Sequence, residues 1–472
     1  MGKKLTILFL TLAALLAVSG CAESGETLPP EAALGEETTE PDTPAAPAEP
    51  NEPEPEPAPA LSERDQGWVD DINYLREQIK DNHYDPFYWC PEEEFDWKLD
   101  QLAAKVGELS DSDIFFELSA VIAGLGDNHT YLGPPSSGPL ANLYYKECFP
   151  IDPIHREGKL YLQAYQEGYE QFAPYLCHEI VAVNGVDISY IWRRFEEFRY
   201  PYSVAQGTRF ENYFVPSFLR WAGCGYQEGF TLQILNDNRE VVSLDLPVVS
   251  YDEFSAGEWI EPELPKTIKT GGNWAEYIQE GENSCIYVSF ADMLVLLDGL
   301  EFSDMEYYMD FAEKTNALIA AHPDCRKLVI DLRRNGGGRA GPARYICEIE
   351  APSIEQTYAL VGPNTGSAAM TAAAKAKAEL DAVLVGSPTG QFTEFFCPMT
   401  EKTYATLPYS GIYLAYSDFW YRCPDDIVEV HRDKKGRLYK WENTILPDVY
   451  VEQTIEDLRE GRDGVMEWVL AQ

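Results

Sequence analysis

The sequence predicts an α/β protein in which a helical N-terminal region and a β-rich middle block precede a parallel-sheet core. Between residues 62 and 125, apolar residues recur at three- and four-residue spacing, as in DDINYLREQIKDNH, which is typical of amphipathic helices. Short apolar runs between turn residues, such as KLYLQAY and FTLQILN, indicate strands between residues 145 and 249. From residue 283 a strand (SCIYVSF), a helix (MEYYMDFAEKTNALIAA) and a second strand (CRKLVIDLR) follow in the order of a parallel α/β unit.

The first 21 residues have the form of a secretion signal. Lysines precede an apolar run from Leu5 to Val18, and small residues then lead to Cys21. This ending resembles the lipobox of bacterial lipoproteins, which implies that Cys21 becomes the lipid-modified first residue of the mature chain. We therefore expect a lipid anchor on the extracytoplasmic side of a bacterial cell membrane. The alternative is an ordinary secretory signal with an incidental cysteine.

Residues 22–60 are rich in Glu, Pro, Ala and Thr and contain no aromatic or basic residue, as in EPNEPEPEPAPA. Such a segment cannot bury enough apolar surface to offset its ordering entropy, so we expect a disordered, extended tether. The formal charge of the whole chain is -43. That balance argues against nucleic acid and against a bare anionic membrane surface as partners.

After the tether, the predicted division is a helical N-terminal domain at 61–140, a β-rich domain at 141–250 and the core at 275–472. Nine cysteines follow Cys21, and none forms a CxxC pair or a metal-ligand cluster. The pattern therefore does not favour zinc, and no metal or organic cofactor is expected. The apolar context SCIYVSF favours a buried free thiol at Cys285.

A glycine-rich turn, DLRRNGGGRAGPA, follows the second strand of the core. Glycines let the backbone adopt positive φ and present bare amide groups to a ligand. The segment lacks the GxGxxG and GxxxxGK[ST] spacings, so phosphate binding is disfavoured. An ordinary turn and the lining of an active site both remain open for it.

Ser367 stands between an apolar run (TYALVGP), a tight turn (PNTG) and an alanine-rich helix. At such a junction the helix amides can stabilise negative charge on an attacking oxygen and its oxyanion. The same position suits a serine that caps the helix. From this stretch alone, a nucleophile and a helix cap are both compatible with Ser367.

The order of these pieces resembles the C-terminal processing (tail-specific) serine peptidases, and more closely their tricorn-core-like branch. LVIDLRRNGGG is similar to the family's strand and glycine turn, GSAAM to its nucleophile motif, and VLVGSPTGQ to the following strand and loop. LPYSGIYLAYSDFW and the C-terminal stretch ILPDVYVEQTIEDLREGRDGVMEWVL resemble its closing strands, turn and helix. The resemblance implies a ClpP- and crotonase-like α/β core and a serine peptidase activity, with Ser367 as nucleophile.

A serine nucleophile needs a base, and the family uses either a histidine or a lysine. AVIAGLGDNHTYL resembles the Asp-x-His-Thr segment of the tricorn-like branch, which implies that His129 is the base. Where the other branch has its lysine, this chain reads GQFTEFFCP. A Ser-Lys peptidase stays open as an alternative, with candidates at Lys375, Lys377 and Lys402. His83, in KDNHYDPFYW, is expected to pack or cap at the end of the first helix.

A third catalytic residue should be a carboxylate that orients the imidazole and stabilises its cation. Two glutamates lie in the matching region, Glu394 and Glu401. Counted back from LPYSG, Glu401 falls at the family's glutamate, so Glu401 is favoured and Glu394 is the alternative.

The family arrangement implies an oxyanion hole of backbone amides, from Gly337 or Gly338 and from Ala368. The implied reaction is acyl transfer to Ser367, with peptides or proteins as substrates. The sequence departs from the family pattern at three places: Gln391 replaces a glycine, Ser387 a frequent glutamate, and Asn128 a small residue.

CHEIVAVNGVDI resembles a strand and turn of the family's PDZ-like domain, which captures extended peptides by strand addition. A degenerate structural module is the alternative for this block. For the whole chain, the alternative to a peptidase is a peptide- or ligand-binding lipoprotein on the same scaffold, because fold alone does not establish activity.

Overall fold

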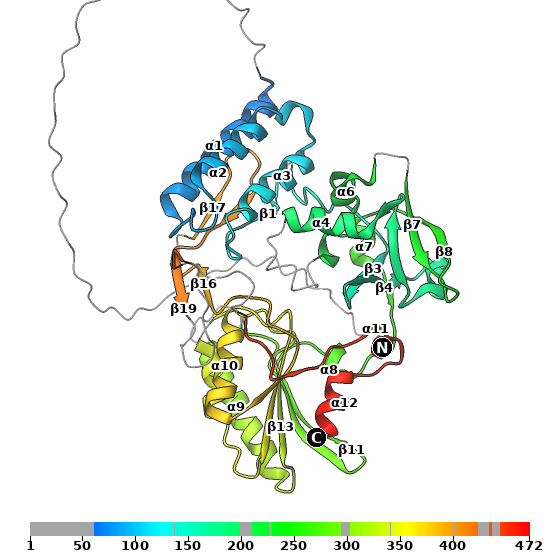
Figure 1. Ribbon diagram of the computed structural model, residues 1–472, viewed down its shortest axis with the longest axis vertical. Helices are drawn as coiled ribbons and strands as arrows, with labels where there is room; N and C mark the ends of the chain where they lie inside the picture. The colour runs from blue at the N-terminus through cyan, green and yellow to red at the C-terminus, as the bar shows by residue number, and fades with distance from the viewer. Residues whose placement is uncertain are drawn as a thin grey trace, which may run out of the picture.

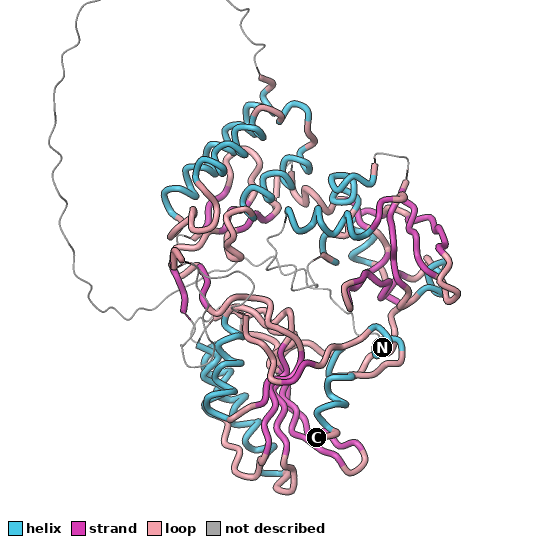
Figure 2. Tube along the Cα trace, in the orientation of Figure 1, coloured by secondary structure: helices cyan, strands magenta, loops and turns pink. Residues whose placement is uncertain are grey.

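The structure is a computed structural model that describes residues 61–135, 137–138, 140–198, 210–225, 229–293, 303–339, 341–400, 403–422, 434–436 and 444–472. Three parts are visible in Figure 1: a group of N-terminal helices, a β-rich part beside them, and a sheet flanked by helices at the opposite end. Figure 2 shows the same division by secondary structure. The order of the parts is the one that the sequence predicts.

The N-terminal part contains three helices, α1 (Glu63–Asn82), α2 (Glu92–Ala103) and α3 (Asp111–Ala123). Helix α3 begins where Ser110 and Asp113 form a reciprocal capping box, which satisfies two backbone amides at the helix start. Helix α1 buries a stripe at helical spacing, formed by Trp68, Ile72, Leu75 and Ile79. The apolar periodicity of the sequence therefore marks the faces that form the core.

Two strands from late in the sequence complete this part. A three-stranded sheet has the order β1-β18-β17, with β1 at Tyr131–Gly133, β17 at Tyr404–Thr406 and β18 at Tyr413–Ala415. The buried carboxylate of Asp71 on α1 accepts backbone hydrogen bonds from Tyr409 (2.7 Å) and Ser410 (2.8 Å). These contacts bind the C-terminal third of the chain to the helices.

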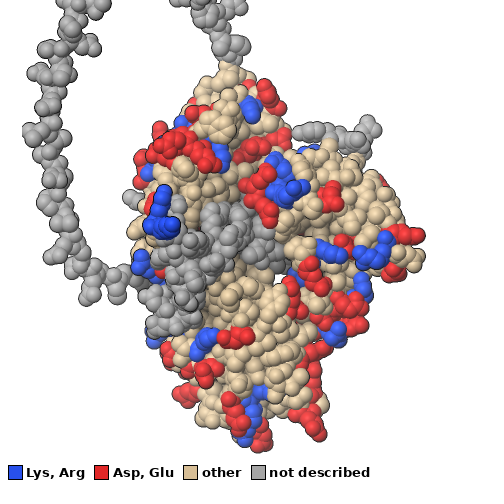
Figure 3. Space-filling model, viewed as in Figure 1, with Lys and Arg blue, Asp and Glu red and all other residues tan. Residues whose placement is uncertain are grey.

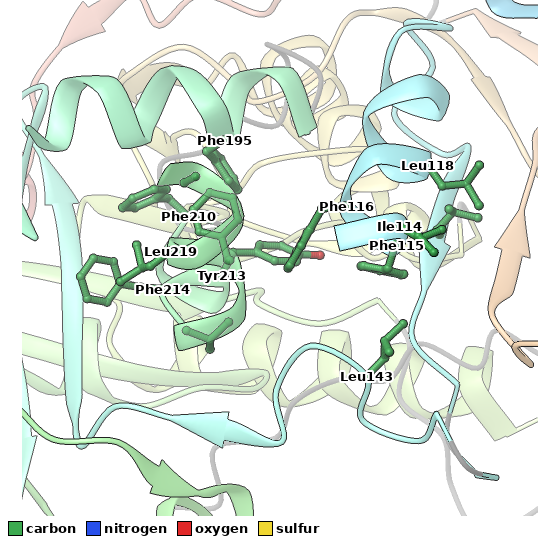
Figure 4. Close-up of a cluster of buried hydrophobic side chains, with 14 of the residues drawn as sticks. Ile114, Phe115, Phe116, Leu118, Leu143, Phe195, Phe210, Tyr213, Phe214 and Leu219 are labelled. Atoms are coloured by element: carbon green, nitrogen blue, oxygen red, sulfur yellow. The ribbon is translucent and has the colours of Figure 1, made fainter. Parts of the chain in front are cut away.

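The middle part is an antiparallel sheet whose strands have the order β10-β4-β5-β7-β8. In addition, β3 pairs with β4 and β6 pairs with β5. Its strands are β3 (Ile151–Arg156), β4 (Lys159–Gln166), β5 (Glu179–Val183), β6 (Val186–Asp187), β7 (Phe230–Leu235), β8 (Val241–Leu246) and β10 (Trp259–Ile260). Helices α4 (Ile188–Phe198), α6 (Pro216–Leu219) and α7 (Tyr251–Ala256) and the pair β2 (Glu147–Cys148) and β9 (Val249–Ser250) adjoin it. Aromatic side chains such as Phe195 and Phe210 pack toward Phe116 of α3, so the first two parts share one core (Figure 4).

The third part is built on a six-stranded sheet of order β11-β12-β13-β14-β15-β20, in which only β11 is antiparallel to its neighbour. The strands are β11 (Trp274–Glu280), β12 (Asn283–Ser289), β13 (Lys327–Asp331), β14 (Gln356–Val361), β15 (Val383–Gly386) and β20 (Val449–Tyr450). The connecting helices include α8 (Lys266–Lys269), α9 (Ser303–Ala321), α10 (Ala368–Leu380), α11 (Ile455–Arg459) and α12 (Gly464–Leu470).

Both faces of this sheet are buried, as is usual for parallel strands. Ile286 and Val288 of β12 pack with α9 and α10, whereas the alternate residues Cys285 and Tyr287 pack with α12. Figure 1 shows α9 and α10 on one side of the sheet and α12 on the other. Cys285 is a buried free thiol, as expected, and burial raises its pKa to about 12.

Three neighbouring parallel strands end at one edge of the sheet. The loop after β13 is the glycine turn, the loop after β14 leads to Ser367, and the loop after β15 leads to Gln391 and to β16 (Glu394–Cys397). Strand β16 forms a two-stranded antiparallel sheet with β19 (Phe419–Arg422). The carboxyl ends of parallel strands are the usual place for ligands in such folds. The motifs of the sequence therefore meet at one edge.

Candidate active site

Ser367 occupies a strained turn between β14 and α10. Its φ is 47° and its ψ is -124°, a conformation that costs a non-glycine residue about 1–3 kcal/mol. The turn is fixed because the Thr365 hydroxyl donates to Leu332 O (2.9 Å) and the Gly366 amide donates to Asn335 O (3.2 Å). The Ser367 side chain forms no capping hydrogen bond to α10. A sharp strand-to-helix turn of this kind presents a serine hydroxyl for attack instead of using it as a cap.

The glycine turn packs directly against this serine. Gly337 has a φ of 101°, and a Cβ added there would lie 2.6 Å from Ser367 Cβ and 2.8 Å from Gly366 O. Only glycine fits both the backbone conformation and this approach.

Two amides beside Ser367 are available for an oxyanion. The predicted donor Gly337 already donates its amide to Asn335 Oδ1 (2.9 Å). In the described part of the chain, the Gly338 and Ala368 amides have no acceptor among the protein groups. Ala368 is the first residue of α10, where helix amides lack an intrahelical partner. Of the three predicted donors, Gly338 and Ala368 are therefore the ones left for a ligand.

A buried ion cluster lies at the base of the glycine turn. Arg333 bonds both Asp331 of β13 and Asp463, which caps the start of α12. Burial alone would lower the pKa of Arg333, but the two carboxylates hold it well above its ordinary value. The cluster fixes the end of β13, from which the turn begins.

His129 lies in the loop between α3 and β1, and its segment reaches the edge of the core sheet. Its ring stacks on Phe395 of β16, with 5.3 Å between ring centroids and 27° between ring planes. Its Nδ1 lies 3.4 Å from Gln391 Nε2. The other end of the same amide, Gln391 Oε1, accepts the backbone N–H of Ser367. The structure thus brings Ser367 and His129 to opposite ends of one side chain.

A second histidine supports this loop from behind. Asp127 is buried and accepts hydrogen bonds from His83 Nε2 (3.2 Å), from the Thr130 hydroxyl and from the His129 backbone amide (2.9 Å). Burial would raise the pKa of Asp127, but the hydrogen bond and charge of His83, with the charge of His129, hold it below its ordinary value. His83 is the C-cap residue of α1, as expected. Its pairing with Asp127 was not predicted from the sequence.

The structure describes only one of the two candidate glutamates. Glu394 begins β16, is buried, and lies opposite Arg422 of β19, whose Nε is 3.9 Å from a Glu394 oxygen. Glu401 and the lysine candidate Lys402 lie outside the described residues. The choice between Glu401 and Glu394 therefore stays a prediction.

The other lysine candidates are engaged away from Ser367. Lys375 Nζ lies 3.7 Å from Cys347 Sγ, and Lys377 forms an ion pair of 2.6 Å with Asp448. Both residues lie on α10 beyond its first turn. Among the described residues, the candidate base linked to Ser367 is thus His129, through the Gln391 side chain.

A small pocket opens beside His129. Its wall contains the aromatic side chains of Trp89, Phe392, Phe395 and Phe396, together with Gln391 and the three residues that precede His129. Sequence reasoning treated Gln391 only as a departure from the family pattern. Gln391 stands among other polar residues in the stretch GSPTGQFTE, so the sequence alone does not single it out.

Comparison with known proteins relates this chain to others through its fold. No family model matches the sequence, and no curated protein matches it. The solved structure of mature CPAF is similar, with a TM-score of 0.53 and 12% identity, over 86% of this chain and 96% of that one. Mature CPAF complexed with lactacystin gives the same TM-score and identity over 86% and 97%.

The photosystem II D1 C-terminal processing protease is also similar, at 11% identity over 86% of this chain and 99% of that one, with a TM-score of 0.39. The likeness to CPAF establishes the fold. It confirms the predicted mixed architecture, with its helical N-terminal region and β-rich parts.

Proposed function

We propose that this chain, which has the fold of the C-terminal processing peptidases, is a serine peptidase that cleaves peptide bonds through an acyl-enzyme. The observation on which this depends most is the Gln391 side chain, which contacts the Ser367 backbone and the His129 ring at once. It joins a strained serine at a helix start to a half-buried histidine from a distant part of the chain. That combination matches a nucleophile with its base.

The reaction follows from the placement of these groups. Ser367 Oγ attacks the substrate carbonyl carbon while its proton passes to the His129 imidazole. The carbonyl oxygen becomes an oxyanion that accepts hydrogen bonds from the Gly338 and Ala368 amides. The imidazolium then protonates the leaving amine, and water releases the acyl group by the same route. Glu401, or Glu394 in its place, stabilises the imidazolium.

The surface is compatible with peptide substrates and unfavourable for polyanions. On the face shown in Figure 3, acidic side chains are spread over all three parts, with basic ones among them. An extended peptide would reach Ser367 at the sheet edge and contact the β-rich part by strand addition, as in PDZ-like domains. We keep peptide or protein substrates as the proposed partner class.

We also propose that the protein is a lipoprotein held at the extracytoplasmic face of the membrane through Cys21. The basis is the lipobox-like ending of the signal and the acidic, proline-rich tether. Within the residues that the structure describes, no helix combines the length and the apolar character needed to cross a membrane. Metabolic labelling with a palmitate analogue, compared with Cys21→Ala, tests the anchor.

One observation favours a second candidate, a lipoprotein that binds peptides without cleaving them. Among the described residues, the Ser367 hydroxyl forms no hydrogen bond, and the His129 Nδ1 contacts the Gln391 amide instead. Apo sites often show such open geometry and close it only with substrate, so the peptidase remains the better interpretation.

Incubation with unfolded, reduced casein separates the two candidates. The peptidase predicts new casein fragments that appear with the wild-type protein and not with Ser367→Ala. Retention of intact casein by both proteins, without fragments, would contradict the peptidase and support the binder.

A further inference from the structure

Gln391 stands where the family resemblance has a glycine, and its side chain is almost fully buried, at 2% exposure. Its loop is fixed on both sides. The preceding Gly390 amide donates to Thr365 O (3.1 Å), two residues before Ser367, and the following Phe392 forms a bridge with Thr444. A buried amide held this firmly needs partners for both of its ends.

The Ser367 backbone decides which way the amide faces. A backbone N–H can only donate, so the Gln391 atom beside Ser367 must be the oxygen. The NH2 group then necessarily faces His129 Nδ1, at 3.4 Å. Hydrogen bonding to the Ser367 N–H therefore determines which end of the Gln391 amide is the oxygen, although the two ends have nearly the same shape.

This orientation selects one tautomer of His129. The Gln391 NH2 group has hydrogens to donate and no lone pair to accept with, so it favours an Nδ1 that carries no proton. The proton of the neutral ring then resides on Nε2. The charge of Asp127, with its partner His83, acts on the same loop from the backbone side.

We propose that Gln391 is a positioning residue that holds His129 in the tautomer with a bare Nδ1, so that Nδ1 is the atom that takes the Ser367 proton. The proposal rests on the proposed function. It assigns a role to a buried side chain that the serine, the base and the oxyanion donors leave unexplained.

The proton balance of the step is simple. The Ser367 O–H bond breaks as Oγ bonds to the carbonyl carbon, the carbonyl π electrons move to oxygen, and an Nδ1–H bond forms. In this step the Ser367 hydroxyl takes the place of the Gln391 N–H at Nδ1. The Gln391 NH2 group cannot return to Nδ1 while this atom carries a proton, because both groups are then donors. This mismatch favours passage of the proton to the leaving amine.

The direct test is ¹⁵N NMR of the full chain with labelled histidine, in which the ring nitrogen shifts identify the tautomer. Loss of one signal set in His129→Gln assigns the residue among the six histidines. The proposal predicts that wild-type His129 carries its proton on Nε2 at rest. A proton on Nδ1 would overturn it, and this result needs no Gln391 variant to fold.

Two variants extend the test. Gln391→Glu keeps an acceptor for the Ser367 amide but accepts from Nδ1–H, so Nδ1 should become protonated and the rate of Ser367 labelling by a fluorophosphonate should fall about 100-fold. Gln391→Met lacks both contacts and should show mixed tautomers and a smaller loss of rate. Unchanged spectra in Gln391→Glu, or faster labelling of Gln391→Met, would overturn the proposal.

These results are distinguishable from failure of the proposed function. If the wild-type serine never reacts with the fluorophosphonate, the peptidase proposal fails, whereas the tautomer of His129 is still measured by the spectrum.

Discussion

Asp127 Oδ1 accepts a hydrogen bond of 2.9 Å from the backbone amide of His129. The other oxygen of the same buried carboxylate meets the His83 ring and the Thr130 hydroxyl. One carboxylate thus fixes the loop that carries the proposed base, and it does so through the main chain of His129. The Asp-x-His-Thr pattern therefore has a structural reason.

Asp127→Asn is expected to destabilise the protein by about 3–5 kcal/mol, because it leaves the buried contacts of the carboxylate partly unmatched. Labelling of Ser367 should fall with it, since the His129 loop loses its support. The matched control is Asp237→Asn, whose partner is also a histidine but whose carboxylate is exposed; it should change little. Urea unfolding of both variants measures the difference, and equal midpoints would contradict the role of Asp127.

The same carboxylate should contribute to acid unfolding. The pKa of Asp127 is lower in the folded protein than in the unfolded chain, where an aspartate has a pKa of about 3.9. At pH values near and between these two pKa values, the unfolded state therefore binds more protons than the folded state. The free energy of unfolding then falls as the pH falls through the folded pKa. The stability gap between wild type and Asp127→Asn should be constant above about pH 4 and shrink below it. A gap that widens on acidification, measured by thermal unfolding, would contradict this sign.

Gly337→Ala tests the approach of the glycine turn to the nucleophile. The added Cβ would meet Ser367 Cβ at 2.6 Å at a φ of 101°, so we expect a cost of about 1–3 kcal/mol and displacement of Ser367. Loss of oxyanion geometry should slow fluorophosphonate labelling about 100-fold. The neighbouring Gly336→Ala is the control, because its Cβ would have no atom within 4 Å. Equal labelling of the two variants would show that the turn does not shape the site.

Asp463→Ala tests the ion cluster under the glycine turn. The change leaves the buried Arg333 with one carboxylate instead of two and removes the cap of α12, so unfolding should become easier by about 3–5 kcal/mol. Glu460→Ala, which removes an exposed partner of Arg462, should have little effect. Urea denaturation curves provide the comparison, and overlapping curves would exclude a structural role for the cluster.

Local sequence patterns predicted much of this fold because helix faces, buried strands and turns depend mainly on neighbouring residues. The period of buried residues in α1, the apolar run of β12 and the junction before Ser367 are all properties of neighbouring residues. The glycine turn was recognisable for the same reason, although its amides could not be ranked. Which amide is free depends on the Asn335 side chain, whose direction a pattern does not give.

Local sequence patterns could not predict contacts between segments that are distant in the sequence. Gln391 meets His129, and Asp71 meets Tyr409, across long stretches of chain whose approach is set by the whole fold. The predicted boundaries stay predictions, but strands β17 and β18 lie between the core strands β15 and β20 in sequence and form a sheet with β1 of the N-terminal part. A division of the chain into consecutive domains does not describe this arrangement. Glu401, the favoured third residue, lies outside the described residues and stays a prediction.

The central claim is that Ser367 is a nucleophile activated by His129. Its most direct test is labelling of the full chain with a fluorophosphonate, followed by mass mapping, in wild type, Ser367→Ala and His129→Ala. The account predicts a single adduct on Ser367 that is absent from both variants. An adduct on Ser367 that persists in His129→Ala would contradict the histidine base and point to a lysine. No adduct on a folded wild-type protein would contradict the peptidase itself.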